Sequence, residues 1–155
     1  MPDAISPDQA GRAALEAFRG RHAGPAGGEL HAGEAARVVR LDRTEGAYFL
    51  VPIRDAAGLR GIVQIDAQTG REETSALIKD PTSGFLLSDA DARGAAQRAR
   101  PQARDWAEPY LGWRPSRESF NSLRPLWVVR HGSGVVYVDQ GGRVFDELSL
   151  SGRGG

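Results

Sequence analysis

The sequence predicts an α+β fold of two similar halves, each an alanine-rich helix packed on a curved antiparallel sheet. The first observation behind this prediction is a pair of helix starts, at Ser6 and Ser88, each followed by alanines at helical spacing. The second is a series of short β-branched runs separated by turn residues, which is typical of antiparallel hairpins. The third is a repeated order of apolar strand, Asp, turn, Gly and Arg, found in residues 61–71 and again in 135–143.

Composition limits both the size and the chemistry of the fold. The chain has 155 residues, 40% of them hydrophobic and 26% charged, which is typical of one ordinary domain or two very small ones sharing a core. Its 20 basic and 20 acidic residues balance, which argues against non-specific binding of nucleic acid. It has no cysteine, so disulfides, thiolate metal sites and cysteine nucleophiles are excluded.

The sequence contains no apolar run long enough to span a membrane, and we expect no membrane partner. The first residues, Met1 to Pro7, have neither the basic nor the apolar segment of a signal peptide. We therefore expect a cytoplasmic protein, with a removed leader as the alternative.

The first half is expected to span residues 1–80. Its helix begins after Ser6, with Pro7 at the first helical position, and ends near Gly20. Three or four strands separated by tight turns are expected: three at 38–42, 47–54 and 61–66, with residues 72–78 as the fourth in the second alternative. Pro52 cannot donate to a ladder, and it predicts an edge position or a bulge.

The second half is expected to span residues 86–150, after a boundary at 79–85 that contains Pro81 and Gly84. Alanines at helical spacing follow Ser88 and continue in phase to Ala107, across Pro101. We expect a kinked helix or two short helices there. Further strands are expected at 126–130, 135–139 and 143–148, and residues 151–155 are expected to fray.

One stretch near the middle carries a family resemblance. Val63 and Ile65 lead into Asp66-Ala67-Gln68-Thr69-Gly70, which is similar to the strand-turn motif of PepSY-type repeats and, more loosely, of cystatin-like repeats. The second half departs from the motif by dropping one turn residue at Gln140-Gly141-Gly142. The resemblance implies a small non-catalytic module, linked with peptidase regulation or extracytoplasmic binding.

Groups that carry catalysis or bind metals are few. Asp66 and Asp139 occupy matching places and could form a carboxylate pair, but Asp at the first position of a turn has an ordinary structural role. The three histidines, His22, His31 and His131, lack the helical spacing of a metal signature. We therefore expect no catalytic residue, no metal site and no cofactor.

An aromatic and arginine cluster in the second half is the strongest candidate for a binding site. The candidate partner-binding residues are Trp113, Arg114, Arg117, Phe120, Trp127 and Arg130. Tryptophans and arginines of this kind suit protein interfaces, but tryptophans would also fill the core beside an alanine-rich helix. We expect a turn at Pro115-Ser116 that brings Arg114 and Arg117 together.

These observations predict a non-catalytic binding module that engages a protein or peptide partner. The resemblance to PepSY-type repeats implies a peptidase-regulating or accessory role for it. One alternative is a small-molecule-binding α+β barrel enzyme of lyase or isomerase type. Another is a protein that forms homo-oligomers by pairing exposed strand edges.

Overall fold

The computed structural model of the chain describes residues 3–22 and 29–149. The described residues fall into two compact units. The first is built from residues up to Val39 and from Glu45–Phe85, and the second from Arg40–Thr44 and the residues from Leu86 on. Both contain one α-helix and antiparallel strands, so the predicted α+β class is confirmed. The tail expected at 151–155 lies outside the described residues.

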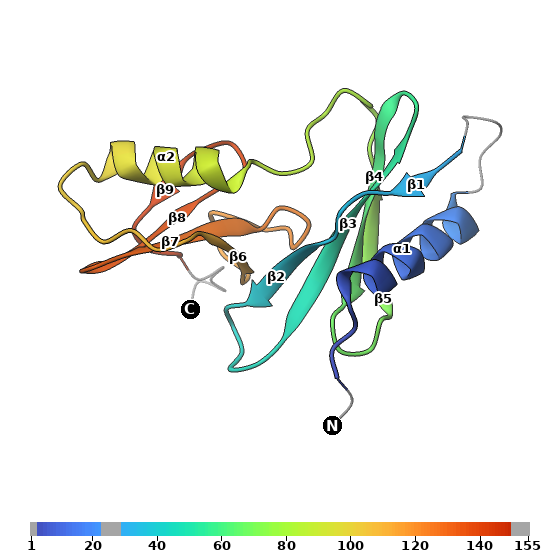
Figure 1. Cartoon of the computed structure of the whole chain (residues 1–155), viewed down its shortest axis with the longest axis horizontal. Coiled ribbons are helices and arrows are strands. Elements are labelled where there is room, and N and C mark those ends of the chain that lie inside the picture. Colours follow the sequence, from blue (N-terminus) through green and yellow to red (C-terminus); the bar gives the residue numbers. More distant parts are fainter. Residues whose placement is uncertain (1–2, 23–28, 150–155) are drawn as a thin grey trace. The chain divides into compact units, whose positions relative to one another are not determined.

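The first unit packs helix α1 (Pro7–Arg21) on an antiparallel sheet (Figure 1). Its strands are β1 (His31–Ala32), β2 (Ala36–Arg40), β3 (Ala47–Asp55), β4 (Gly58–Asp66) and β5 (Glu72–Leu77). They run in the order β5-β4-β3-β2, and β1 also pairs with β3. The Ser6 hydroxyl caps the helix as predicted. The small Ala10 and Ala14 let α1 approach β3 and β4 closely, and Phe18 adds the bulk of the contact.

Pro52 lies in β3, which is an interior strand of this sheet and not an edge. Its carbonyl accepts a hydrogen bond from the Gly33 backbone at 2.8 Å. In a strand, the nitrogen and oxygen of one residue point to the same side, so the Pro52 nitrogen also faces the break between β1 and β2. Because no strand pairs with β3 at that break, the lack of an N–H group on Pro52 costs the sheet little stability. The predicted bulge lies next to it, between Ile53 and Arg54.

The second unit packs helix α2 (Asp89–Ala99) on one face of a smaller sheet (Figure 1). Its strands are β6 (Tyr110–Trp113), β7 (Leu126–His131), β8 (Gly134–Val138) and β9 (Val144–Phe145), in that order across the sheet. The core beneath α2 consists of Ala92, Ala95, Ala96, Val129, Val136 and Val138. Trp106 and Trp127 pack against this core, which confirms that these two rings fill space beside the alanines.

The expected continuation of the second helix to Ala107 is wrong. The helix ends at Ala99, and Arg100 has the non-helical cap conformation. Pro101 disfavours the helical conformation in the residue before it, so the helix stops there and does not kink. The expected strand at 143–148 is also shorter, with only Val144–Phe145 paired.

The two Asp turns are closed by their own carboxylates. Asp66 accepts a hydrogen bond from the Gln68 backbone at 3.1 Å, and Gly70 donates to the Asp66 carbonyl at 2.9 Å. Asp139 accepts from two backbone N–H groups of its turn, and Gly142 donates to its carbonyl at 3.0 Å. Gly70 has φ +74° and Gly142 has φ +86°, both in the left-handed region that favours glycine. These contacts give both carboxylates a structural role.

No helix in the described part of the chain is both long enough and apolar enough to cross a membrane.

Candidate functional site

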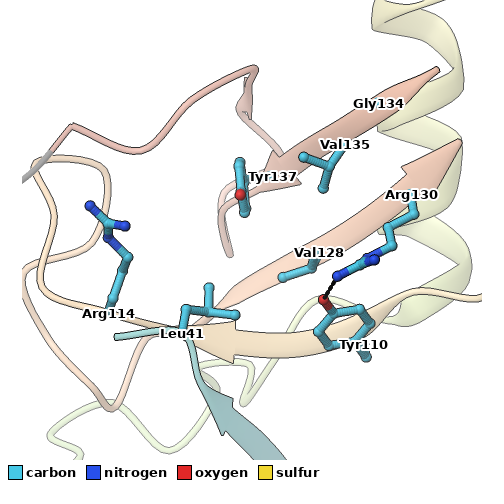
Figure 2. Close-up of a pocket in the computed structure, with 8 residues that line it drawn as sticks. All are labelled: Leu41, Tyr110, Arg114, Val128, Arg130, Gly134, Val135 and Tyr137. Carbon is cyan, nitrogen blue, oxygen red and sulfur yellow. Dashed lines mark hydrogen bonds between the residues drawn. The ribbon is translucent and has the colours of Figure 1, made fainter. Parts of the chain in front are cut away.

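The most promising site lies on the face of the second sheet that α2 leaves uncovered. Side chains alternate between the two faces of a strand, so the neighbours of Val129 and Val136 point away from the helix. That face holds an open groove of about 450 Å³, within the usual size range of ligand pockets. The residues lining the groove are Leu41, Tyr110, Arg114, Val128, Arg130, Gly134, Val135 and Tyr137 (Figure 2).

Strand register sets the floor of the groove. Val128 is the cross-strand partner of Tyr110 on one side and of Tyr137 on the other. These three residues therefore form one row across β6, β7 and β8. Arg130 and Val135 are paired in register beside that row. The floor is thus aromatic and aliphatic, with a guanidinium at its margin.

Leu41 forms a wall of the groove because a glycine lies beneath it. Its backbone N–H donates to the Trp113 carbonyl at 2.9 Å, which holds residue 41 against β6. A β-carbon at Gly112 would lie 2.9 Å from a methyl group of Leu41, closer than such atoms approach. Only glycine leaves room for the leucine side chain in this position.

The charge of the groove is positive. Arg130 lies over the ring of Tyr110, 5.9 Å from its centroid, and donates a hydrogen bond of 3.3 Å to its hydroxyl. This hydrogen bond raises the pKa of Arg130 above its usual value. Within the described chain, the Arg114 side chain has no hydrogen bond or ion pair. Among the described residues, no carboxylate lines the groove.

The two arginines lie at opposite ends of the groove, with Leu41 and Val128 between them (Figure 2). The groove is thus suited to an anionic ligand with an apolar middle, because each guanidinium can bind a carboxylate through two parallel hydrogen bonds.

The predicted site residues separate into three groups. Arg114 and Arg130 line the groove. Trp113 is buried, with 8% of its surface exposed, and donates its indole N–H to the Ser119 hydroxyl at 3.1 Å. Trp127 is half-buried and donates its indole N–H to the Leu87 carbonyl at 2.9 Å. These indoles support the sheet and its loop, and neither lines the groove.

Arg117 and Phe120 belong to the loop between β6 and β7. The Arg117 backbone N–H donates to the carbonyl of Ser149 at 3.2 Å, so it does not close the expected turn back to Arg114. Arg114 lines the groove and Arg117 does not. Phe120 is 79% exposed.

A second hollow of about 400 Å³ lies beside Phe120. Its lining includes Glu118, Phe120, Arg124, Gln140 and Arg143. Two of its polar groups are already used within the fold. Glu118 accepts from the hydroxyl and backbone N–H of Ser149, and the Gln140 amide accepts from the Leu87 backbone and donates to the Pro125 carbonyl. The described lining of this hollow also includes the carboxylates Glu118 and Asp139, whereas that of the groove includes none, so the groove is the better candidate for an anionic ligand.

Metal-binding and catalytic arrangements are not assembled in the described part of the chain. No group of three or more His, Asp and Glu residues is close enough there to hold a metal ion. His131 packs its ring against Trp106, with centroids 5.0 Å apart. Its Nδ1 lies 3.4 Å from the exposed hydroxyl of Ser133, and no carboxylate completes a triad among the described residues.

Several groove residues did not emerge from the sequence. The alternation of Val128 with Arg130, and of Val135 with Tyr137, was a usable signal, because each pair shares one face of its strand. Tyr110 and Leu41 had no such signal. They join the groove only through pairing with residues distant in the sequence.

No protein-family model, curated protein or solved structure matches the chain. The chemistry of the groove is therefore the basis for assigning a function.

Proposed function

We propose that the protein is a non-catalytic binding module whose groove binds an acidic peptide segment of a protein partner. The observation that carries the proposal is the pairing of two guanidiniums, Arg114 and Arg130, in one open groove without a carboxylate among its described lining residues. A negative ligand would be attracted there and a positive one repelled.

The composition of the floor favours a peptide. Tyrosine and arginine are enriched where proteins recognise one another. Tyrosine offers a large contact area with few rotatable bonds, and arginine offers a rigid guanidinium fork. Arg130 is already held over Tyr110 before a ligand arrives. Less side-chain freedom is lost on binding when a contact is preformed, so this arrangement favours affinity.

The enzymatic alternative receives less support. A lyase or isomerase needs a group that exchanges a proton near neutral pH. The described lining of the groove contains tyrosines and arginines but no histidine, aspartate or glutamate. The groove therefore offers binding groups but no obvious general acid or base.

We also propose that the two units are tandem repeats of the PepSY-like kind. Support comes from matching local features: each helix follows a serine cap, buries small alanines on two strands, and precedes an Asp turn with a left-handed glycine. An experimental structure in which the two units could not be superposed strand for strand would contradict this proposal.

The binding proposal is tested by titrating the protein with a hexaglutamate peptide in a calorimeter at low ionic strength, with hexalysine as the matched control. We expect hexaglutamate to bind and hexalysine not to bind. An Arg114→Ala, Arg130→Ala double variant should lose about tenfold or more in affinity. An Arg117→Ala, Arg124→Ala double variant loses the same charge from exposed positions outside the groove and should change affinity by less than about twofold.

Equal losses in the two double variants would show that the peptide responds only to net charge. That result, or a failure of acidic peptides to bind at all, would overturn the proposed function.

A further inference from the structure

The register of the second sheet sets the spacing that a ligand must match. Tyr110 pairs with Val128 and Gly112 pairs with Leu126. Arg130 therefore lies two residues beyond the Tyr110 row in one direction, and Arg114 lies four residues beyond it in the other. Pro115 keeps Arg114 extended, so β6 continues in nearly the same direction through this residue. At about 3.3 Å per residue, the two α-carbons lie about 20 Å apart along the strands.

The Arg130 guanidinium does not lie at the level of its own α-carbon. It leans back over Tyr110, whose ring and hydroxyl it contacts. Tyr110 is four residues from Arg114, which corresponds to about 13 Å along an extended chain. The cationic group at that end of the groove is therefore about four residues, not six, from the level of Arg114.

An extended peptide has the same rise per residue as the strands beneath it. Side chains at positions i, i+2 and i+4 point to one face, whereas a side chain at i+3 points to the other. Carboxylates at i and i+4 would reach the two guanidiniums, and the side chain at i+2 would lie over the middle of the floor. That middle is the level of Gly112, where the Leu41 side chain lies over the strand and makes the floor apolar.

Resting on the proposed function, we propose that the groove selects an extended segment with the pattern acidic–x–apolar–x–acidic. The outer carboxylates bind Arg114 and Arg130, and the central aliphatic side chain packs on Leu41. The partner is thus a protein whose exposed segment carries two Asp or Glu residues four positions apart around an apolar residue.

The test uses three capped peptides that have the same amino-acid composition and differ only in residue order. The first contains Glu-Ser-Val-Ser-Glu, the second Glu-Ser-Val-Glu-Ser, and the third Ser-Glu-Glu-Val-Ser, each between the same Gly-Ser flanks. Affinities are measured by titration while following the NMR signals of Tyr110 and Tyr137. We expect the first peptide to bind about fivefold or more tightly than the other two, because only it presents both carboxylates on one face at the right separation.

The variants separate a spacing effect from a charge effect. Arg114→Ala and, as a second form, Arg114→Gln should weaken the first peptide to the level of the others and so abolish the preference. Arg117→Ala, outside the groove, should keep it. Equal binding of the three peptides, still weakened by loss of Arg114 and Arg130, would overturn the spacing inference and leave the proposed function standing. Failure of all three peptides and of hexaglutamate to bind would overturn both.

Discussion

The indole nitrogen of Trp113 donates a hydrogen bond of 3.1 Å to the hydroxyl of Ser119, and both residues are buried. The same hydroxyl lies 2.6 Å from the carbonyl of Arg124, to which it donates. Ser119 thereby joins the end of β6 to the far side of the loop that precedes β7. Arg114 begins that loop, so this small network also positions one end of the groove.

Ser119→Ala should destabilise the protein by about 1–3 kcal/mol, because it leaves a buried indole N–H and a buried part of the loop without their partner. The measurement is the free energy of unfolding by urea. Ser133→Ala is the matched control, since its hydroxyl is exposed in the β7–β8 turn, and it should change stability by less than about 0.5 kcal/mol. An unchanged stability in Ser119→Ala would show that water satisfies these groups equally well.

Local chemistry made much of the fold predictable. The helix N-termini at Ser6 and Ser88 were predictable because a helix cap needs only a side-chain oxygen and the backbone of the next turn. The Asp66 turn was predictable for the same reason, because its hydrogen bonds join residues only a few positions apart, such as Asp66 and Gly70. Each of these features is decided within a few positions of the chain.

The groove was less predictable because it depends on pairing across long sequence distances. β6 is only four residues long, contains Gly112 and follows Pro109, so it shows no clear alternation of apolar and polar residues. The sequence groups Arg114 and Arg130 in one aromatic and arginine cluster, but only β6 and its register to β7 show that both side chains line the same groove. The position of Arg114 beside Pro115-Ser116 predicted a pairing with Arg117, which the backbone hydrogen bond from Arg117 to Ser149 does not support.

Gly70→Ala should destabilise the first unit by about 1 kcal/mol. The expected loss of stability comes from backbone strain alone, because an added β-carbon would have room. Gly70 has φ +74°, and the nearest atoms to an added β-carbon belong to Ile5, at an ordinary contact distance of 3.6 Å. Thermal or urea unfolding measures the change. Gly84→Ala is the control, since its φ lies outside the left-handed region and nothing lies within 4 Å of an added β-carbon. Equal effects in the two variants would argue against strain at Gly70.

The pH dependence of stability should contain a contribution from Asp55. The hydrogen bond from Arg60, with Nε 2.6 Å from the carboxylate, lowers the pKa of Asp55 against the opposing effect of burial. A carboxyl whose pKa is lower in the folded state stabilises the fold at pH values above its unfolded pKa. That stabilisation is lost as the pH falls through about 4 and below.

Asp55→Asn should therefore make the acid-side decline in the free energy of unfolding shallower. The measurement is urea unfolding at a series of pH values from about 7 down to about 3, on either side of the ordinary Asp value. Arg60→Ala should flatten the same step, because it removes the cation that lowers the pKa of Asp55. An acid-side slope that stays the same in both variants would show that other carboxyls account for it.

The last prediction places a carboxylate inside the groove itself. Val135 is half-buried and is the cross-strand partner of Arg130, on the same face of the sheet. Paired residues of this kind have β-carbons about 5 Å apart, so a glutamate at 135 would form an ion pair with the Arg130 guanidinium. Val135→Glu should thus lower the affinity for an acidic peptide by about tenfold, because one cationic group is neutralised and the new carboxylate repels the ligand. Val135→Gln has nearly the same shape without the charge and should retain most of the affinity. Peptide titration at two salt concentrations measures both variants, and the difference between them should shrink at high salt, because ions screen exposed charges. Equal affinities in Val135→Glu and Val135→Gln would show that the peptide does not reach Arg130.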